Sequence, residues 1–561
     1  MKALPTPGAE PSGSSWSRSL RFPGGVLIWR ILAWSCAIVL LAPVVFVLWG
    51  VVSGADGGSW DHVQSNLLGP AVRDTAILVA GVCLFAFLLG VPAAWCVSSY
   101  QFPGRSLLSV LLVLPLAVPP YVAAYASTEA REAFIPTLVK IRQDWGVEAF
   151  LKIELIHRFG WLVLIFAAVL YPYVFLACRS SFSGASRRLA EASRSLGAGG
   201  WKTFWSVNLP LARPALVAGL FLVAMEVLND YGAVHHLGID TMTVKIFRTW
   251  FDLGELETAR RLAGWMLLGV FALVLVEQCQ RGRRRFSSGL ESVAPRRRCG
   301  TAGTISCWLV CLLPVFLGLL LPVYVLLDWL GASAKEEPLT EVLNAARNSL
   351  LLGAGVTMTC LAIGLIIAGI ARFTKTRSDR LLGQVSGIAG YASPGAVMAV
   401  GILGLAAILR NLFHQDTWLG SQLLSDSLLW LGFALTARYI AISIQMTRQS
   451  HSSIPGSYDQ AASTLGRGPL ASFLTIHLPL LRPALAGAAV LIFVDVCKEL
   501  PLCLLLRPFD FETLGTWTFS LIKEDQIFAC ATPSLILILT CATGLTLVEA
   551  FGWRHQRRRQ P

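Results

Sequence analysis

The sequence predicts an all-α polytopic membrane protein with about twelve transmembrane helices in two parallel six-helix repeats. Only 14% of its 561 residues are charged and 55% are hydrophobic, whereas a soluble chain carries about 25% charged residues. Apolar runs of roughly 20 residues, long enough to cross a bilayer, recur along the whole chain. One polar segment also occurs twice, at a constant offset of 269 residues. Together these observations predict a membrane protein built by duplication.

The apolar runs divide evenly between two halves of the chain. The predicted spans are 28–51, 76–97, 106–125, 160–178, 214–233 and 260–277, then 304–327, 348–371, 385–409, 427–446, 483–503 and 527–549. The sequence does not define the exact ends of the spans 214–233, 260–277 and 483–503. Pro119 and Pro394 are expected to break the third span of each half, since proline removes a backbone donor. Six spans per half give both halves the same orientation.

The basic residues divide the chain into domains and set its orientation. The predicted domains are a disordered cytoplasmic tail (1–25), a first half (26–279), a basic cytoplasmic linker (280–303), a second half (304–552) and a basic cytoplasmic tail (553–561). Lys and Arg mark the cytoplasmic side of membrane proteins. This places both termini and both copies of the repeated segment in the cytoplasm. The net charge of +13 is explained in this way, so we expect no nucleic-acid partner.

The repeated segment predicts a compact knob in each half. The first copy holds Glu191, Ala192, Gly197, Leu209 and Pro210, and the second holds Gln460, Ala461, Ala462, Gly466, Leu478 and Pro479. Helices over 186–195 and 458–465 are expected to end at the glycines in a left-handed turn. A second short helix should follow and stop at Leu-Pro, where the next span begins. Two such knobs suggest sockets for a soluble partner; the alternative is an amphipathic loop that lies on lipid headgroups.

Four carboxyl groups fall inside predicted spans. Glu226 and Asp230 are four residues apart, and Asp495 and Glu499 repeat this spacing at the same offset. Each pair should share one helix face, and buried carboxylates should face the protein interior, where Arg438 can pair with one of them. They could line a passage for a hard cation such as Fe³⁺. The alternative is that they cap helix ends or form structural ion pairs.

The repeated segment resembles the Glu-Ala-Ala-x3-Gly-x9-Ile-x-Leu-Pro signature of the permease subunits of bacterial ABC importers. The resemblance implies the MetI-like permease fold, in which the knob docks on an ATPase subunit. It assigns this coupling role to the eleven repeat residues named above. Ser193 and Val207 depart from the signature, as does Gln460, which replaces its acid. Two ABC ATPase subunits, an extracytoplasmic binding protein and a location in the bacterial inner membrane are implied as well.

Further segments resemble the fused two-half permeases of ferric-iron importers. These segments are 115–125, 225–232, 495–501 and 504–509. Thiamine permeases share this architecture, so thiamine or another small solute stays open as the cargo. The chain contains no GxxxxGK[ST] or other catalytic motif, so we expect no enzyme activity, bound cofactor or stable metal, and ATP and Mg²⁺ should bind the partner. The rival functions are an ion-coupled secondary transporter and a membrane-embedded enzyme.

Overall fold

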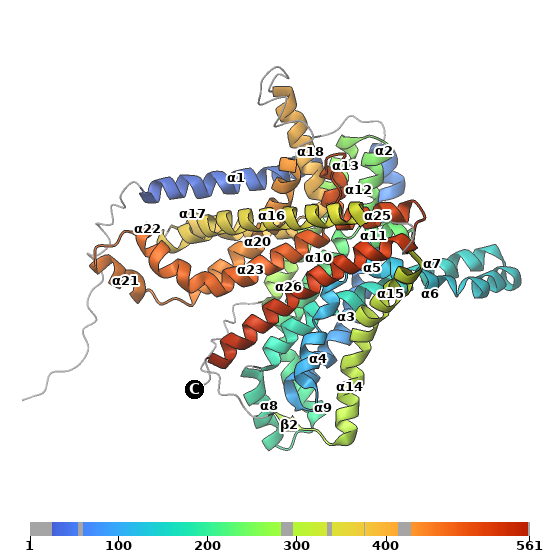
Figure 1. Ribbon diagram of the computed structural model, residues 1–561, viewed down its shortest axis with the longest axis horizontal. Coiled ribbons are helices and arrows are strands. Elements are labelled where there is room, and N and C mark those ends of the chain that lie inside the picture. Colours follow the sequence, from blue (N-terminus) through green and yellow to red (C-terminus); the bar gives the residue numbers. More distant parts are fainter. Residues whose placement is uncertain are drawn as a thin grey trace, which may run out of the picture.

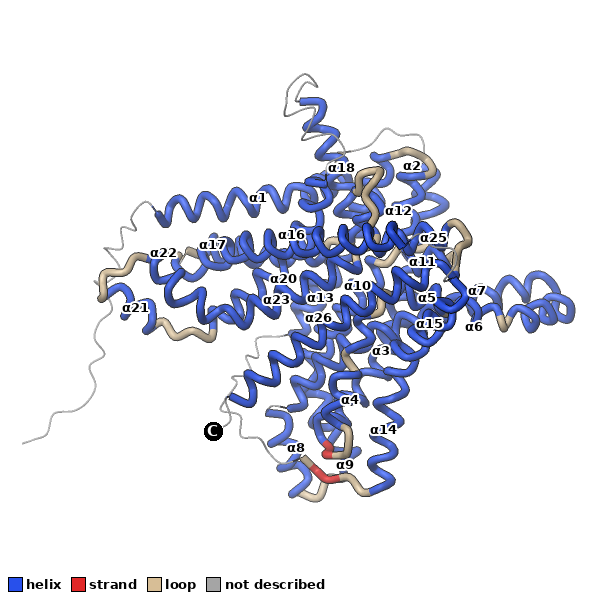
Figure 2. The backbone as a smooth tube through the Cα atoms, viewed as in Figure 1, coloured by secondary structure: helices blue, strands red, loops and turns tan. Residues whose placement is uncertain are grey.

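The computed structural model describes residues 25–53, 60–183, 185–281, 296–333, 339–374, 376–412 and 428–558. Within these residues the chain is almost entirely helical (Figure 2). The exception is a short parallel ladder between β1 (Tyr100–Gln101) and β2 (Arg297–Arg298). Almost all of the predicted tail 1–25, most of the linker 280–303 and the last three residues lie outside the described residues.

The helices follow the two halves of the sequence. The first half contains α1 (Gly25–Val52), α2 (Trp60–His62), α3 (Gly69–Ser99), α4 (Arg105–Leu111), α5 (Pro120–Ala126), α6 (Thr128–Glu132), α7 (Ile135–Ser183), α8 (Ala185–Ser195), α9 (Gly200–Thr203), α10 (Leu209–Asn229), α11 (Gly232–His236), α12 (Met242–Phe251) and α13 (Leu256–Arg281). The second contains α14 (Thr301–Val315), α15 (Leu321–Ser333), α16 (Leu339–Phe373), α17 (Arg377–Ala392), α18 (Gly395–Leu412), α20 (Leu428–Ser452), α21 (Ser457–Thr464), α22 (Pro469–Ser472), α23 (Leu478–Lys498), α24 (Pro501–Leu506), α25 (Leu514–Lys523) and α26 (Ala531–Arg558). Short π or 3₁₀ turns lie at η1 (Val63–Leu68), η2 (Leu114–Ala117), η3 (Phe204–Asn208), η4 (Phe316–Leu320), η5 (Phe473–His477) and η6 (Phe528–Cys530).

The number of membrane-spanning elements agrees with the sequence. Among the described residues, eleven helices are long and apolar enough to cross a bilayer, and a bent pair brings the number to twelve. That pair consists of 105–117 and α5, which meet at an angle of 89° around Pro119. Pro394 likewise separates α17 from α18. The predicted helix breaks are therefore confirmed at both prolines.

The structure gives the helix ends that the sequence left open. The spans predicted over 214–233 and 483–503 end as helices at Asn229 and Lys498, where the backbone becomes extended at the next residue. The span predicted over 385–409 contains the break at Pro394, so its long apolar helix is α18. Apolar composition continues across each break and hides it, because the short helices that follow are buried too.

The described helices form two arms that diverge from a common base (Figure 1). One arm carries α21 and α22 at its end, and the other carries α8 and α9. The first span of each half crosses to the other half: α1 packs on α16, α17 and α18, and α14 packs on α3 and α7. Two apolar cores result, and each combines helices from both halves. We call the two packed units lobes: α3, α7, α10 and α14 form the first lobe, and α1, α16, α20 and α23 form the second.

Polar contacts fix α1 to the second lobe. The indole of Trp29 donates a hydrogen bond to the Ile366 carbonyl at 2.9 Å. Arg30 and Trp34 both donate to the buried carboxylate of Asp379, at 3.1 and 2.8 Å. A buried carboxylate needs such partners. Asp379 therefore specifies where α1 docks.

Asp379→Ala should loosen this contact. Loss of the acceptor leaves the Trp34 indole unpaired, at a cost of about 1–3 kcal/mol. We expect the apparent melting temperature of the detergent-solubilised protein to fall by several degrees. Asp328→Ala, at an exposed position on α15, is the matched control and should melt as the wild type does. Equal melting of both variants would contradict the role of Asp379.

Candidate functional site: two exposed knobs and an acidic cavity

Both knobs end their first helix in the same glycine turn. Gly197 and Gly466 have φ of 87° and 73°, a left-handed conformation that glycine adopts without steric cost. In the first knob, the N–H groups of Gly197 and Ala198 donate to the carbonyls of Arg194 and Ser193. In the second knob, Gly466 and Arg467 donate to Ser463 and Ala462. Each knob thus forms a Schellman motif, as the sequence predicted.

The second helix of each knob was predicted to stop at Leu-Pro, and this was wrong. In the structure α9 continues through the π turn η3 into α10, and α22 continues through η5 into α23. Leu209 donates to the Phe204 carbonyl, and Leu478 donates to Phe473. Proline at the second position of α10 or α23 lacks an N–H, and the wider π turn accommodates it. Each knob is therefore continuous with a membrane helix.

The predicted coupling residues mostly face solvent. Glu191, Ala192 and Gly197 are exposed, as are Gln460, Ala461 and Gly466, whereas Ala462 is buried. Leu209, Pro210, Leu478 and Pro479 lie in the first turns of α10 and α23. Sequence reasoning missed the apolar residues beside the glycines. Leu196 is 87% exposed and Leu465, at the same offset of 269, is 79% exposed.

Further apolar residues extend this exposed surface on both knobs. Trp201 and Trp205 are exposed on the first knob, and Leu470 and Leu474 are exposed at the corresponding positions of the second. Exposed apolar patches of this kind mark interaction surfaces for a protein or a membrane. The signal was present in the sequence as large apolar residues that repeat at the same offset inside a polar segment.

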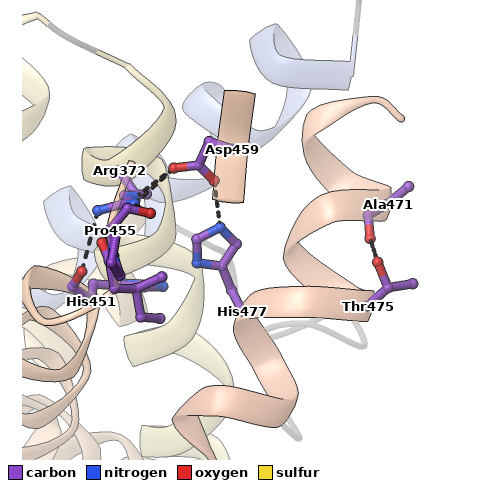
Figure 3. A network of polar contacts seen from close by, with 8 residues as sticks. Arg372, His451, Pro455, Asp459, Ala471, Thr475 and His477 are labelled. Atoms are coloured by element: carbon purple, nitrogen blue, oxygen red, sulfur yellow. Dashed lines mark hydrogen bonds and ion pairs between the residues drawn. The ribbon is translucent and has the colours of Figure 1, made fainter. Parts of the chain in front are cut away.

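The second knob is fixed by an ionic contact to α16 (Figure 3). Asp459 accepts hydrogen bonds from Arg372 at 2.7 Å and contacts His477 Nε2 at 2.6 Å. Arg372 also donates to the carbonyls of His451 and Ile454. The first knob has Ala190 and Asn208 at the positions of Asp459 and His477. It cannot form the same contact.

A cavity at the base of the two arms holds all four predicted carboxyl groups. It encloses about 550 Å³ of empty space, part of which is open to solvent. Glu226 and Asp230 enter it from the first lobe, and Asp495 and Glu499 enter it from the second. Tyr121, Tyr173, Tyr439, Asn229 and Lys498 line it as well. The four carboxyl groups selected by their spacing thus line one cavity.

The prediction that each pair of carboxyl groups shares one helix face was wrong, because one member of each pair lies beyond the end of its helix. Asp230 and Glu499 follow the ends of α10 and α23, in extended backbone, so neither shares a helix face with its neighbour. Asp230 accepts hydrogen bonds from the N–H groups of Ala233 and Val234. Glu499 accepts one from the Leu502 N–H. Both side chains therefore cap the short helix that follows, which is the alternative that the sequence left open.

The remaining contacts of the carboxylates are made by cationic side chains and by tyrosine hydroxyls. Arg438 pairs with Glu499 at 3.4 Å, as expected, and Tyr439 donates to Glu499 at 2.5 Å. Lys498 pairs with Asp495 at 3.1 Å. Tyr173 donates to Glu226 at 3.3 Å. Among the described residues, no group of three or more His, Cys, Asp and Glu side chains is arranged to hold a metal ion.

Two polar contacts cross between the lobes at this cavity. The Asn229 side-chain oxygen accepts hydrogen bonds from the Gly395 N–H at 2.7 Å and from Arg438 at 2.5 Å. A Cβ atom at Gly395 would lie 2.7 Å from both Arg438 and Glu499, so only glycine permits this approach. Lys498 donates in the opposite direction, to the Leu116 carbonyl at 3.4 Å. The bonds to Gly395 and Leu116 join the ends of α10 and α23 to the broken third span of the other half, and the bond from Arg438 joins the end of α10 to α20.

A helical membrane chain with a polar cavity between two lobes, and with two equivalent knobs at the ends of the arms, is a transmembrane permease. The chain belongs to the family of binding-protein-dependent transport system inner membrane components, whose model matches residues 86–277. It is therefore a multi-pass inner-membrane permease subunit and not an enzyme.

Relatives of this chain include both two-half and single-half permeases. The Fe(3+)-transport system permease protein FbpB 2 of Haemophilus influenzae is 25% identical over 86% of this chain and 90% of its own length. The molybdenum transport system permease protein ModB of Escherichia coli is 32% identical over 30% of this chain and 69% of its own. The sulfate transport system permease protein CysT of Escherichia coli is 27% identical over 35% and 69%. The two-half architecture is thus shared with the first relative.

Asn229→Ala should weaken the contact between the lobes. The change leaves the Gly395 N–H and the buried Arg438 without this acceptor, at about 1–3 kcal/mol, so the apparent melting temperature should fall by several degrees. Asn229→Asp keeps an acceptor oxygen and should retain most of the stability. Asn66→Ala, an exposed control, should have no effect. Wild-type melting of Asn229→Ala would show that this contact contributes nothing.

Proposed function

We propose that this permease imports ferric iron, with its two halves on one chain and two ABC ATPase subunits bound to its knobs. An extracytoplasmic binding protein delivers the substrate at the opposite side. Both termini and both knobs face the cytoplasm. ATP and Mg²⁺ bind the ATPases, and this chain itself binds no cofactor.

The observation that carries the ATPase contact is the pair of equivalent exposed knobs. Both have the same glycine turn, and both expose a leucine beside it, Leu196 and Leu465. An exposed leucine fills an apolar pocket on a partner and loses water by doing so. Because each knob runs directly into a membrane helix, a force on the knob reaches α10 or α23 without an intervening hinge. An ion-coupled secondary transporter has no use for this duplicated device.

The arrangement of the lobes supports a rocking mechanism. The arms diverge toward the knobs (Figure 1), while Asn229 and Lys498 hold the lobes together at the base. This corresponds to a state open to the cytoplasm. Closure of the ATPases would draw the knobs together and separate the base. The ATPases then bias a two-state equilibrium of rigid lobes.

The acidic cavity supports a cationic cargo. Four carboxyl groups and one cationic side chain, Lys498, line the cavity, and Arg438 pairs with Glu499. Carboxylate and phenol oxygens are hard ligands that suit a hard cation such as Fe³⁺. The two-half relative is a ferric permease by name. Acids alone would suit cationic thiamine as well, so thiamine stays the alternative cargo of the same class.

A second candidate cargo is an oxyanion. Lys498 in the cavity can bind an anion, and the molybdenum and sulfate permeases are relatives. The excess of carboxyl groups disfavours it, since like charges repel. Radioactive uptake into proteoliposomes, with ferric iron and molybdate as competitors, separates the two candidates.

Leu196→Asp together with Leu465→Asp should release the ATPase. Both side chains are exposed, so folding should be unaffected, while a charge buried in the contact should weaken binding by about a hundredfold. Co-purification of the ATPase with the tagged permease measures this. Phe509→Asp is the matched control: Phe509 is 95% exposed and lies between α24 and α25, away from the knobs. Retention of the ATPase by the double variant would refute docking at the knobs.

Glu226→Gln together with Asp495→Asn should reduce iron uptake by about tenfold or more, because the cavity loses two negative charges that attract the cation. The ATPase should stay attached, since neither residue lies in a knob. Uptake by proteoliposomes that contain the complete complex is the measurement. Glu148→Gln, on the exposed part of α7, is the control. Unchanged uptake by the double variant would assign these carboxylates to structure.

A further inference from the structure

Lys498 places an ammonium group among the carboxylates of the cavity. Its side chain is 16% exposed and bonds to Asp495 at 3.1 Å and to the Leu116 carbonyl at 3.4 Å. Glu226 lines the same cavity from the other lobe. The ammonium therefore shares this cavity with carboxylates of both lobes, where a transported cation would bind.

The fold itself does not require a cation at this position. Lys498 corresponds to Asn229 at the offset of 269, and both are the last residue of their helix. Asn229 reaches across to the other lobe with a neutral side chain and forms a well-bonded contact. The same place in the second half could hold an amide as well. The positive charge of Lys498 thus has a purpose other than packing.

The contacts of the four carboxylates identify which of them are free to bind a cation. Asp230 and Glu499 are held by the helices that they cap. Within the described part of the chain, Glu226 accepts a hydrogen bond from Tyr173, and Asp495 pairs with Lys498. Glu226 and Asp495 are therefore the available pair. Lys498 forms an ion pair with one member of this pair, Asp495.

A further unsatisfied oxygen lines the same cavity. Tyr121 is 2% exposed, and its hydroxyl has no hydrogen-bond partner among the described residues. A buried hydroxyl without a partner is costly. A hard cation bound in this cavity would take this oxygen as one of its ligands. This observation is independent of the acidic residues.

We propose that Lys498 is a tethered counter-ion that occupies the cation position between Glu226 and Asp495 and restricts it to cations of high charge. The proposal rests on the cationic cargo proposed above. A monovalent cation gains no more from a carboxylate than the ammonium does, whereas a trivalent cation gains about three times as much at the same distance. Only a highly charged cation therefore displaces Lys498. Displacement also breaks the bond to Leu116 and removes one contact between the lobes.

Terbium(III) is the probe for this position, because it is a hard trivalent cation whose luminescence is excited through nearby tyrosines. The full chain in phosphatidylcholine nanodiscs is titrated with terbium chloride. We expect Lys498→Gln to bind at least about tenfold more tightly than the wild type, because the competing charge is gone. Lys498→Arg keeps the charge and should bind as the wild type does. Glu226→Gln in the Lys498→Gln background should abolish the gain.

Lys245→Gln is the matched control. Lys245 pairs with Asp240 at 2.7 Å on α12, outside the cavity, and this change should leave terbium binding unchanged. If Lys498→Gln is not monodisperse, Lys498→Asn, which copies Asn229, replaces it. Equal or weaker binding by these variants overturns the counter-ion role. If terbium binding is then still weaker in the double variant Glu226→Gln with Asp495→Asn, the proposal of a cationic cargo is retained. If no variant alters terbium binding, the proposal of a cationic cargo is overturned as well.

Discussion

Charged groups buried between two membrane lobes must find partners within the protein, and this constraint organises the centre of the molecule. A carboxylate in an apolar surrounding costs several kcal/mol unless it is paired or hydrated. The four carboxyl groups meet it in three ways: Asp230 and Glu499 bind helix N-termini, Asp495 binds an ammonium, and Glu226 binds a phenol. Each of these partners lies in the same lobe as its carboxylate. The lobes are joined instead by Asn229, which accepts from Gly395 and Arg438, and by Lys498, which donates to the Leu116 carbonyl.

The duplication is visible in the backbone and has diverged in the chemistry. The π turns, the glycine turns and the ends of α10 and α23 recur at the same offset. The side chains at equivalent positions differ: the first half has Asn229 where the second half has Lys498. Backbone geometry is retained because it places the knobs and the cavity. Side-chain identity varies because a cavity that serves one substrate needs only one set of charges.

The two knobs likewise share their backbone geometry and differ in their side chains. Both present an exposed leucine beside the glycine, yet only the second is fixed to α16 through Arg372 and Asp459. The second knob also carries Gln460 where the first carries Glu191. The first knob packs on its lobe through Phe204, which contacts Trp95 and Phe182. The two knobs thus share their shape but differ in the contacts described for them.

The sequence by itself determined the membrane class, the number of spans, the two repeats and the glycine turns. It also selected the four carboxyl groups that line the cavity. These depend on apolar length, on proline and glycine conformation, and on an exact repeat, all of which are local properties. It did not determine the ends of α10 and α23, the passage of α1 and α14 to the opposite half, or the exposure of Leu196 and Leu465. Only the tertiary structure decided these, because a buried helix end looks the same as a buried helix interior in composition. The bond from Lys498 to the Leu116 carbonyl depends on which lobe each helix joins, and that is set by packing between distant parts of the chain.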